Sequence, residues 1–205
     1  MSALDHDRLD APPSLRLILR ATACNNAWAN HRLLRACALL SNEEFAATRT
    51  GFFPSLRGTL NHILTVDWFY VDAIERTLAG RPVNVDPGRF FEPAEPCADC
   101  AGLSAEQHAV DARLVAVCAG LQDVDLERPV SVPRGDHVQR ERLDRLLAHL
   151  FQHQVHHRGQ AHAMLSGTRI APPQLDEFFA AEEAPLRELD FAELGFDEQW
   201  IWGRT

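Results

Sequence analysis

Four long stretches with helical periodicity, separated by proline and glycine, constrain the fold of this chain more than any other feature. In each stretch, apolar residues recur at the spacing of one face of an α-helix. The expected helices cover about residues 14–40, 55–79, 104–121 and 140–166. No internal repeat and no convincing domain boundary interrupts them. The pattern predicts an all-α fold in which the four helices pack as a four-helix bundle.

Short local signals mark the ends of the helices and the connections between them. Ser14 follows two prolines and can cap the first helix, and Gly167 ends the fourth. Residues 82–102 hold four prolines and are expected to form a surface loop. Residues 127–142, ERPVSVPRGDHVQRER, combine an alternating stretch with a turn, which predicts a small hairpin or an irregular crossover.

The C-terminal segment is too rich in aromatic residues to be a free tail. Its large aromatic residues are Phe178, Phe179, Phe191, Phe196, Trp200 and Trp202. We expect short helices here, packed on the bundle or at a subunit contact. The chain is therefore divided into the bundle, residues 1–167, and an irregular C-terminal extension, residues 168–205.

Charge and composition argue against several classes of function. The formal net charge is −9, which argues against nucleic acid as a main partner, since phosphate neutralisation needs a basic face, and weakens the case for docking on anionic membranes. No apolar run approaches the roughly 20 residues that span a bilayer. The N-terminus, MSALDHDRLDAPPS, is polar and acidic, unlike a signal peptide. Five cysteines, an odd number, fit a reducing compartment better than a disulfide framework. We therefore expect a cytoplasmic protein without nucleic-acid or membrane partners.

Five of the chain's ten histidines lie within residues 149–165, HLFQHQVHHRGQAHAML. His153 and His157 are one helical turn apart on one face, which lets two imidazoles reach one ion, as in the helical H-E-x-x-H zinc motif. The same row contains Leu146, Leu150, Gln160 and Met164. This row is expected to face the core, where two imidazoles must share a polar partner, a water or a metal ion. His156 and His162 lie off this face, and we expect neither to bind the ion.

His62, the one histidine of the second expected helix, is the candidate third ligand. Metal sites in helical bundles draw side chains from facing helices. Three neutral imidazoles with one open position suit Zn²⁺, Ni²⁺ or Fe²⁺. Gln160 follows His157 by three residues and can hold an imidazole by a hydrogen bond. His149, one turn before His153, is expected to support a ligand or to line the entrance.

Several other polar residues are assigned no role at the metal site. Asp67 lies about 140° around the helix from His62, and we expect a paired or solvated acid rather than a ligand. Arg158 is expected to face outward, and Gly159 to allow the close approach of a neighbouring helix. Cys97 and Cys100 are expected to be two free thiols of the loop. The remaining cysteines are expected in the core: Cys24, Cys37 and Cys118.

Three segments together resemble the DinB-like family of bacterial proteins. They are NNAWANHRLL, SLRGTLNHILTVDWFYVDAI and HLFQHQVHHRGQAHAMLSG, and the resemblance covers about residues 15–167. It implies an up-down-down-up four-helix bundle and a metal site whose ligands map to His62, His153 and His157. It also implies a homodimer and a bound divalent ion such as nickel or zinc. The same superfamily includes thiol-dependent S-transferases and a thiol-dependent isomerase.

An open three-histidine site is the pattern of catalytic metal centres, whereas structural zinc sites are usually closed. Such a site can lower the pKa of bound water toward about 7 or activate a thiolate. The H-x3-H motif lacks the glutamate of H-E-x-x-H, which argues against a metalloprotease.

We therefore expect a metal-dependent enzyme, either a thiol S-transferase or a hydrolase, acting on a small molecule, in the first case together with a low-molecular-weight thiol. Two alternatives stay open at this point. One is a non-catalytic, stress-related protein in which the metal joins the helices. The other is a histidine-rich helix that serves as a pH-sensitive contact.

Overall fold

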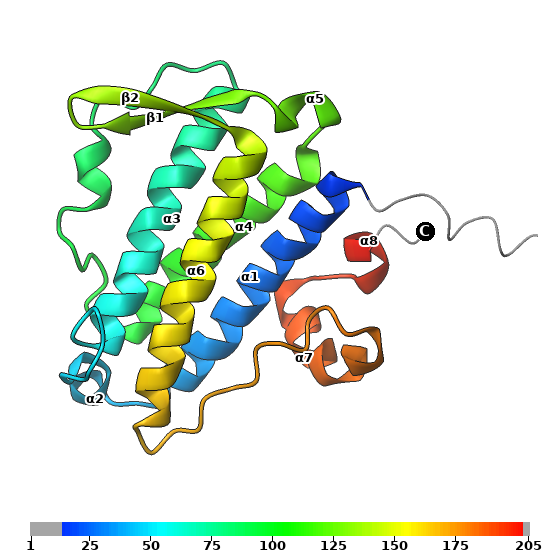
Figure 1. Cartoon of the computed structure of the whole chain (residues 1–205). Helices are drawn as coiled ribbons and strands as arrows, with labels where there is room; N and C mark the ends of the chain where they lie inside the picture. The colour runs from blue at the N-terminus through cyan, green and yellow to red at the C-terminus, as the bar shows by residue number, and fades with distance from the viewer. Residues whose placement is uncertain (1–13, 203–205) are drawn as a thin grey trace, which may run out of the picture.

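The computed structural model describes residues 14–202 and is mostly helical, with one small antiparallel sheet. Its four long helices, which lie side by side (Figure 1), are α1 (Leu15–Cys37), α3 (Leu56–Leu78), α4 (Cys100–Gly120) and α6 (Leu143–Ser166). The N-terminal stretch that argues against a signal peptide lies almost wholly outside the described residues, as do the last three residues of the C-terminal extension. Between residues 14 and 202, no helix is both long and apolar enough to cross a membrane.

The shorter elements connect the long helices or follow them. They are α2 (Asn42–Ala46), η1 (Pro87–Phe90), α5 (Asp123–Leu126), β1 (Pro129–Arg134), β2 (His137–Arg142), η2 (Ala181–Glu183), α7 (Ala184–Leu194) and α8 (Glu198–Trp202).

The directions of the long helices follow from contacts at their ends. Arg16, at the start of α1, donates to the carbonyl of Leu121 just after α4 (3.3 Å), so α1 and α4 are antiparallel. Thr59, at the start of α3, contacts Met164 near the end of α6 (3.7 Å), so α3 and α6 are antiparallel as well. Residues 79–99 carry the chain back along the molecule, so that α4 runs in the same direction as α3 (Figure 1).

Capping residues set where the helices begin. Ser14 and Ser55 cap α1 and α3, since each side chain accepts a hydrogen bond from a free backbone N–H of the first turn. The helix expected at Ser104 begins four residues earlier, because the Asp99 side chain accepts from the backbone N–H of the first turn. Cys100 is therefore the first residue of α4 rather than part of a loop.

The connection between α5 and α6 is a β-hairpin, so the chain is not purely α-helical. Strands β1 and β2 pair antiparallel around a turn in which Gly135 has a φ of +64°. Val130 and Val132 are fully buried and fix which face of β1 points toward the helices. Because residues 140–142 belong to β2, α6 begins three residues later than expected.

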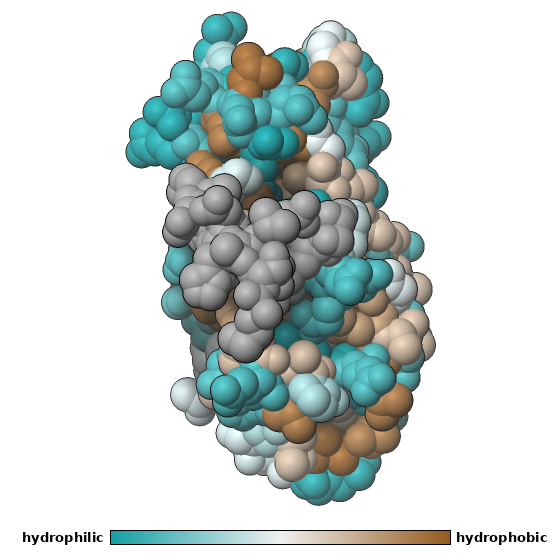
Figure 2. All heavy atoms as spheres, turned by 90° about the vertical axis from the view of Figure 1, so that its right-hand side faces the viewer, coloured by the Kyte–Doolittle hydropathy of each residue, from teal (hydrophilic) through white to brown (hydrophobic). Residues whose placement is uncertain are grey.

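The C-terminal segment folds back against α1. Trp28 of α1 is fully buried in an apolar cluster with Phe178, Phe191 and Ile201. Arg32 adds a polar contact by donating to the carboxylate of Asp190 (2.6 Å). Figure 2 views the molecule from the side of this segment and shows hydrophobic residues gathered toward its lower end. Part of the aromatic set expected to pack is exposed, including Phe179 (50%) and Trp200 (41%).

Candidate metal centre

Helices α3 and α6 bring the three predicted histidines together. His62 comes from α3, and His153 and His157 come from successive turns of α6. The Nε2 atoms of His62 and His153 are 3.0 Å apart. One ring nitrogen from each of the three residues lies within 4.8 Å of the other two. The antiparallel pair of helices thus forms a cluster of three imidazoles from residues 91 and 95 positions apart in the chain.

This donor set fits a divalent metal ion. Nitrogen ligands about 2.0–2.1 Å from a tetrahedral Zn²⁺ lie about 3.4 Å from one another. The 3.0 Å between the His62 and His153 nitrogens is close to that spacing. Imidazole nitrogen suits zinc, nickel and iron. The donor set of His62, His153 and His157 can therefore hold a metal ion.

Burial keeps the three imidazoles in the neutral form that binds metals. Desolvation, with a smaller contribution from the neighbouring His157, lowers the pKa of His62 to about 4. The same cause, together with the surrounding histidines, lowers the pKa of His153 to about 3. Desolvation also lowers the pKa of His157, although its hydrogen bond to Gln160 acts in the opposite direction. At neutral pH the cluster therefore offers lone pairs rather than protons.

The two predicted supporting residues differ in what they touch. The Nδ1 of His157 donates to the side-chain oxygen of Gln160 (2.9 Å), which is the expected contact. His149 contacts Tyr70 instead, with 3.4 Å between its Nε2 and the phenol oxygen. His162 points away from the cluster and donates to the carbonyl of Pro173 (2.9 Å), as its position on the helix predicted.

Two phenylalanines that sequence reasoning missed cover one side of the cluster. The ring of Phe53 lies 4.4 Å from that of His62 and 5.7 Å from that of His157, measured between centroids. Phe52 lies beside it, 6.4 Å from the His157 ring, and is 78% exposed. The signal was present in the sequence Gly-Phe-Phe-Pro at residues 51–54, where two aromatic residues occupy a turn.

Two predictions about α6 are wrong. Arg158 does not face outward but is only 5% exposed, and it donates to the side-chain oxygens of Asn26 (2.6 Å) and Asn30 (2.8 Å) on α1. Gly159 does not admit a neighbouring helix, because a Cβ atom there would meet nothing within 4 Å. The physical reason is that α6 contacts α1 as well as α3, which places Arg158 in the core and Gly159 on the surface.

The other predicted non-ligands have the expected environments. Asp67 is buried and paired, accepting hydrogen bonds from Gln107 (2.8 Å) and Gln154 (2.9 Å). The five cysteines are all free. Cys97 is buried and Cys100 is partly exposed, although the latter stands in a helix rather than in a loop.

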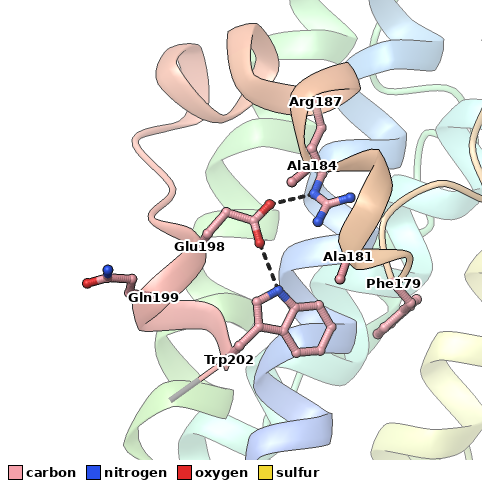
Figure 3. Close-up of a pocket in the computed structure, with 7 residues that line it drawn as sticks. All are labelled: Phe179, Ala181, Ala184, Arg187, Glu198, Gln199 and Trp202. Carbon is pink, nitrogen blue, oxygen red and sulfur yellow. Dashed lines mark hydrogen bonds and ion pairs between the residues drawn. The ribbon is translucent and has the colours of Figure 1, made fainter. Parts of the chain in front are cut away.

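A cavity of about 530 Å³ lies away from the histidine cluster, between η2, α7 and α8 (Figure 3). It is lined by Phe179, Ala181, Ala184, Arg187, Glu198, Gln199 and Trp202. The carboxylate of Glu198 accepts from Arg187 (2.6 Å) and from the indole of Trp202 (2.9 Å), so its charge is already paired. The lining contains no histidine or cysteine. The histidine cluster, not this cavity, is therefore the candidate centre of chemistry.

Comparison with known proteins identifies the family of the chain. The family model for the DinB family matches residues 20–190, which include all three histidines. No curated protein matches the chain. The match extends beyond Gly167 into the C-terminal segment, which the sequence resemblance did not cover. Since the match spans most of the 205 residues, the chain belongs to the DinB family.

Proposed function

We propose that the chain is a metal-dependent enzyme. It binds one divalent metal ion through His62, His153 and His157. The observation that carries this proposal is the convergence of three imidazoles from two helices, with ligand atoms within 4.8 Å of one another. The opposite directions of the α1–α4 and α3–α6 pairs support the up-down-down-up four-helix bundle as its scaffold. Zinc, nickel and iron all fit this donor set.

Three histidine ligands leave a fourth position of a tetrahedral ion for a substrate atom. In the part of the chain that the structure describes, the cluster consists of three histidines, with no cysteine or carboxylate as a fourth member. A bound metal supplies a Lewis acid that lowers the pKa of a coordinated water or thiol. Gln160 holds the His157 ring in place, and Phe53 shields one side of the cluster from water.

Of the two reaction types, thiol transfer is favoured. A hydrolase commonly employs a carboxylate as general base beside the metal, as in H-E-x-x-H, and no carboxylate joins this cluster among residues 14–202. A thiolate is itself the nucleophile once it has lost its proton. We therefore propose the transfer of a low-molecular-weight thiol to a small electrophile.

The metal site is tested by measuring the metal content of the purified protein and of three variants, His62→Ala, His153→Ala and His157→Ala. We expect about one ion per wild-type chain and a large loss in each variant, because two imidazoles hold an ion far less tightly than three. His162→Ala, which removes a histidine of the same helix outside the cluster, is the matched control. Full metal content in all three variants would show that the site is wrong.

A second measurement separates an enzyme from a protein in which the ion only joins α3 and α6. The protein is loaded with Co²⁺, and its visible spectrum is recorded as 2-mercaptoethanol is added. A thiolate-to-cobalt absorption band is expected if one coordination position is open to substrate. An unchanged spectrum, with a large drop in melting temperature on chelation, would favour the non-catalytic alternative.

A further inference from the structure

A polar pocket, separate from the cavity at η2, α7 and α8, lies beside α3 and α6 at the end nearest the β-hairpin. It is an open pocket of about 210 Å³, lined by residues of α3, β1, β2 and α6. Its polar lining consists of Tyr70, Arg134, Gln139, Glu141, Arg145 and His149. His149 was expected only to support a ligand or line the entrance of the metal site, and the other residues had no expected role.

The register of the hairpin places Arg134 in this pocket. Side chains alternate between the two faces of a strand, so Arg134 shares the face of Val130 and Val132, which are fully buried against the helices. Gln139 pairs with Val132 across the two strands and therefore lies on the same face. Arg134 and Gln139 are themselves exposed at this edge of the hairpin, and Arg140, the next residue along, lies on the opposite face.

Arg134 is held in place without a counter-charge. Its Nε donates to the side chain of Gln139 (3.1 Å), and its Nη2 donates to the phenol oxygen of Tyr70 (2.6 Å). Its guanidinium also lies 5.5 Å from the ring centroids of both Phe69 and Tyr70. Within residues 14–202 it forms no ion pair with a carboxylate. Because a guanidinium carries five N–H donors, three are left for a ligand.

The other charges of the pocket favour a monoanion. Arg145 adds a second guanidinium, and its Nη1 is 3.5 Å from the carboxylate of Glu141. This pair is largely neutral, so Arg134 supplies the net positive charge. The negative charge of Glu141 opposes a dianion such as a phosphate monoester. A carboxylate, which matches the planar fork of arginine, fits these charges.

The pocket lies on the same two helices as the metal site, α3 and α6, and neighbours it along both. His149 lies one turn before His153 on α6, about 6 Å along the helix, and Tyr70 lies two turns after His62 on α3, about 12 Å along it. The phenol oxygen of Tyr70 is 3.4 Å from His149. Arg134, Tyr70 and His149 thus form a row of polar groups that leads from the pocket toward the histidine cluster.

We propose that this pocket binds a carboxylate of the substrate whose reacting group is held at His62, His153 and His157. The inference rests on the proposed function and adds to it the class of substrate: an elongated small molecule with a carboxylate about one to two helical turns, or about 6–12 Å, from the reacting atom. Arg134 is the residue that recognises the carboxylate.

The test measures thiol binding to the Co²⁺-loaded protein. A series of ω-mercaptocarboxylates with chains of two to eight carbons is compared with ω-mercaptoalcohols of equal length, with the thiolate-to-cobalt band as the readout. In the wild type, we expect the carboxylate of best-fitting length to bind about tenfold or more tightly than its alcohol. Arg134→Gln is expected to lose this preference while it binds the alcohol as before. Arg140→Gln, on the outer face of the same hairpin, should retain it.

The outcomes separate this inference from the proposed function. Equal binding of carboxylates and alcohols by the wild type, or a preference that persists in Arg134→Gln, would overturn the carboxylate pocket and leave the open metal site intact. If Co²⁺ binds but no thiol of either series changes the spectrum, the proposed function fails and the inference with it. Should Arg134→Gln misfold, Arg134→Lys keeps the charge but not the planar fork, and a reduced preference is expected. An unchanged preference in this variant would contradict recognition by the fork.

Discussion

At the scale of single residues, the hydrogen bond between His157 and Gln160 determines which ring nitrogen of His157 is free. A neutral imidazole carries one N–H, and the amide oxygen of Gln160 accepts it at Nδ1 (2.9 Å). The amide nitrogen of Gln160 donates in turn to His156 (3.1 Å), which fixes the orientation of the amide. The lone pair on Nε2 of His157 is therefore available to a metal ion.

Replacement of Gln160 by alanine is expected to weaken Zn²⁺ binding about 10- to 100-fold, because the His157 ring loses the acceptor that sets its tautomer. The affinity is measured by competition with a chromophoric chelator. Gln152→Ala removes an exposed glutamine from the same helix and should bind as tightly as the wild type. Equal affinities for the two variants would mean that Gln160 has no part in holding the ligand.

The residues of the cluster were predictable from the sequence, whereas much of their surroundings was not. The spacing of His153 and His157 fixes their common face on any α-helix, and His62 is the one histidine of its helix. Arg158 was misplaced because its charge suggested solvent, while the structure surrounds it with polar partners on α1. Phe53 was missed because loop geometry does not follow from periodicity.

At the scale of the helices, a buried polar network joins all four long elements. Asp111 of α4 accepts hydrogen bonds from Asn26 and Asn30 of α1, at 3.0 Å each. Arg158 of α6 donates to the same two asparagines. Asp67 of α3 is joined to Asp111 through Gln107, which donates to both carboxylates. Since unpaired buried polar groups are costly, this network favours one register of the four helices over others.

Asp67 makes stability depend on pH. Burial, with repulsion from Asp111, raises its pKa to about 8, compared with about 3.9 in an unfolded chain. Between these values the folded chain keeps a proton that the unfolded chain releases. The stability due to this protonated carboxyl is therefore present at low pH and is lost as the pH rises from about 4 through about 8. Rotation of the Gln154 amide would offer the protonated carboxyl an acceptor, since its oxygen is buried without a partner.

The variant Asp67→Asn is expected to avoid this loss, because its amide does not ionise. Its free energy of unfolding, relative to that of the wild type, should rise by at least about 2 kcal/mol between pH 5 and pH 8.5. Urea denaturation at a series of pH values measures the difference. Asp136→Asn, at a side chain that is 96% exposed, should show little such change. A pH-independent difference for Asp67→Asn would contradict a protonated Asp67.

Helix ends and connections were partly predictable. The predicted bounds of three of the four long helices lie within about three residues of those in the structure. The start of α4 was misplaced because the proline-rich stretch before it suggested a loop, and the capping role of Asp99 was overlooked. The hairpin was one of two expected forms for its segment, since a short alternating stretch alone does not establish that its residues pair.

At the scale of the whole molecule, the C-terminal segment completes the core on one side of α1. Without it, Trp28, which is fully buried, would be exposed to water. Sequence composition predicted that this segment is not free, but aromatic content alone does not say which surface it covers. The homodimer implied by the family resemblance stays a prediction. We expect that contact to include the exposed side chains of Leu186 (58%) and Leu189 (80%) on α7.

Asp190 is the polar anchor of this segment, and its replacement by alanine is the sharpest test of how the segment is held. Its carboxylate accepts from the indole of Trp28 (3.1 Å) and from Arg32 (2.6 Å). Asp190→Ala leaves the buried indole N–H without an acceptor and removes one partner of a mostly buried ion pair. We expect a loss of about 2–3 kcal/mol in the free energy of unfolding, measured by urea denaturation, and faster proteolysis of residues 168–202.

The matched control is Glu188→Ala, which removes an exposed carboxylate from the same helix and should change stability by less than about 0.5 kcal/mol. Metal content is the second readout, because the histidines lie on α3 and α6 and the segment packs on α1. If the segment serves only to cover α1, Asp190→Ala retains its metal while it loses stability. Loss of metal together with stability would instead show that the core under Trp28 and the metal site unfold as one unit.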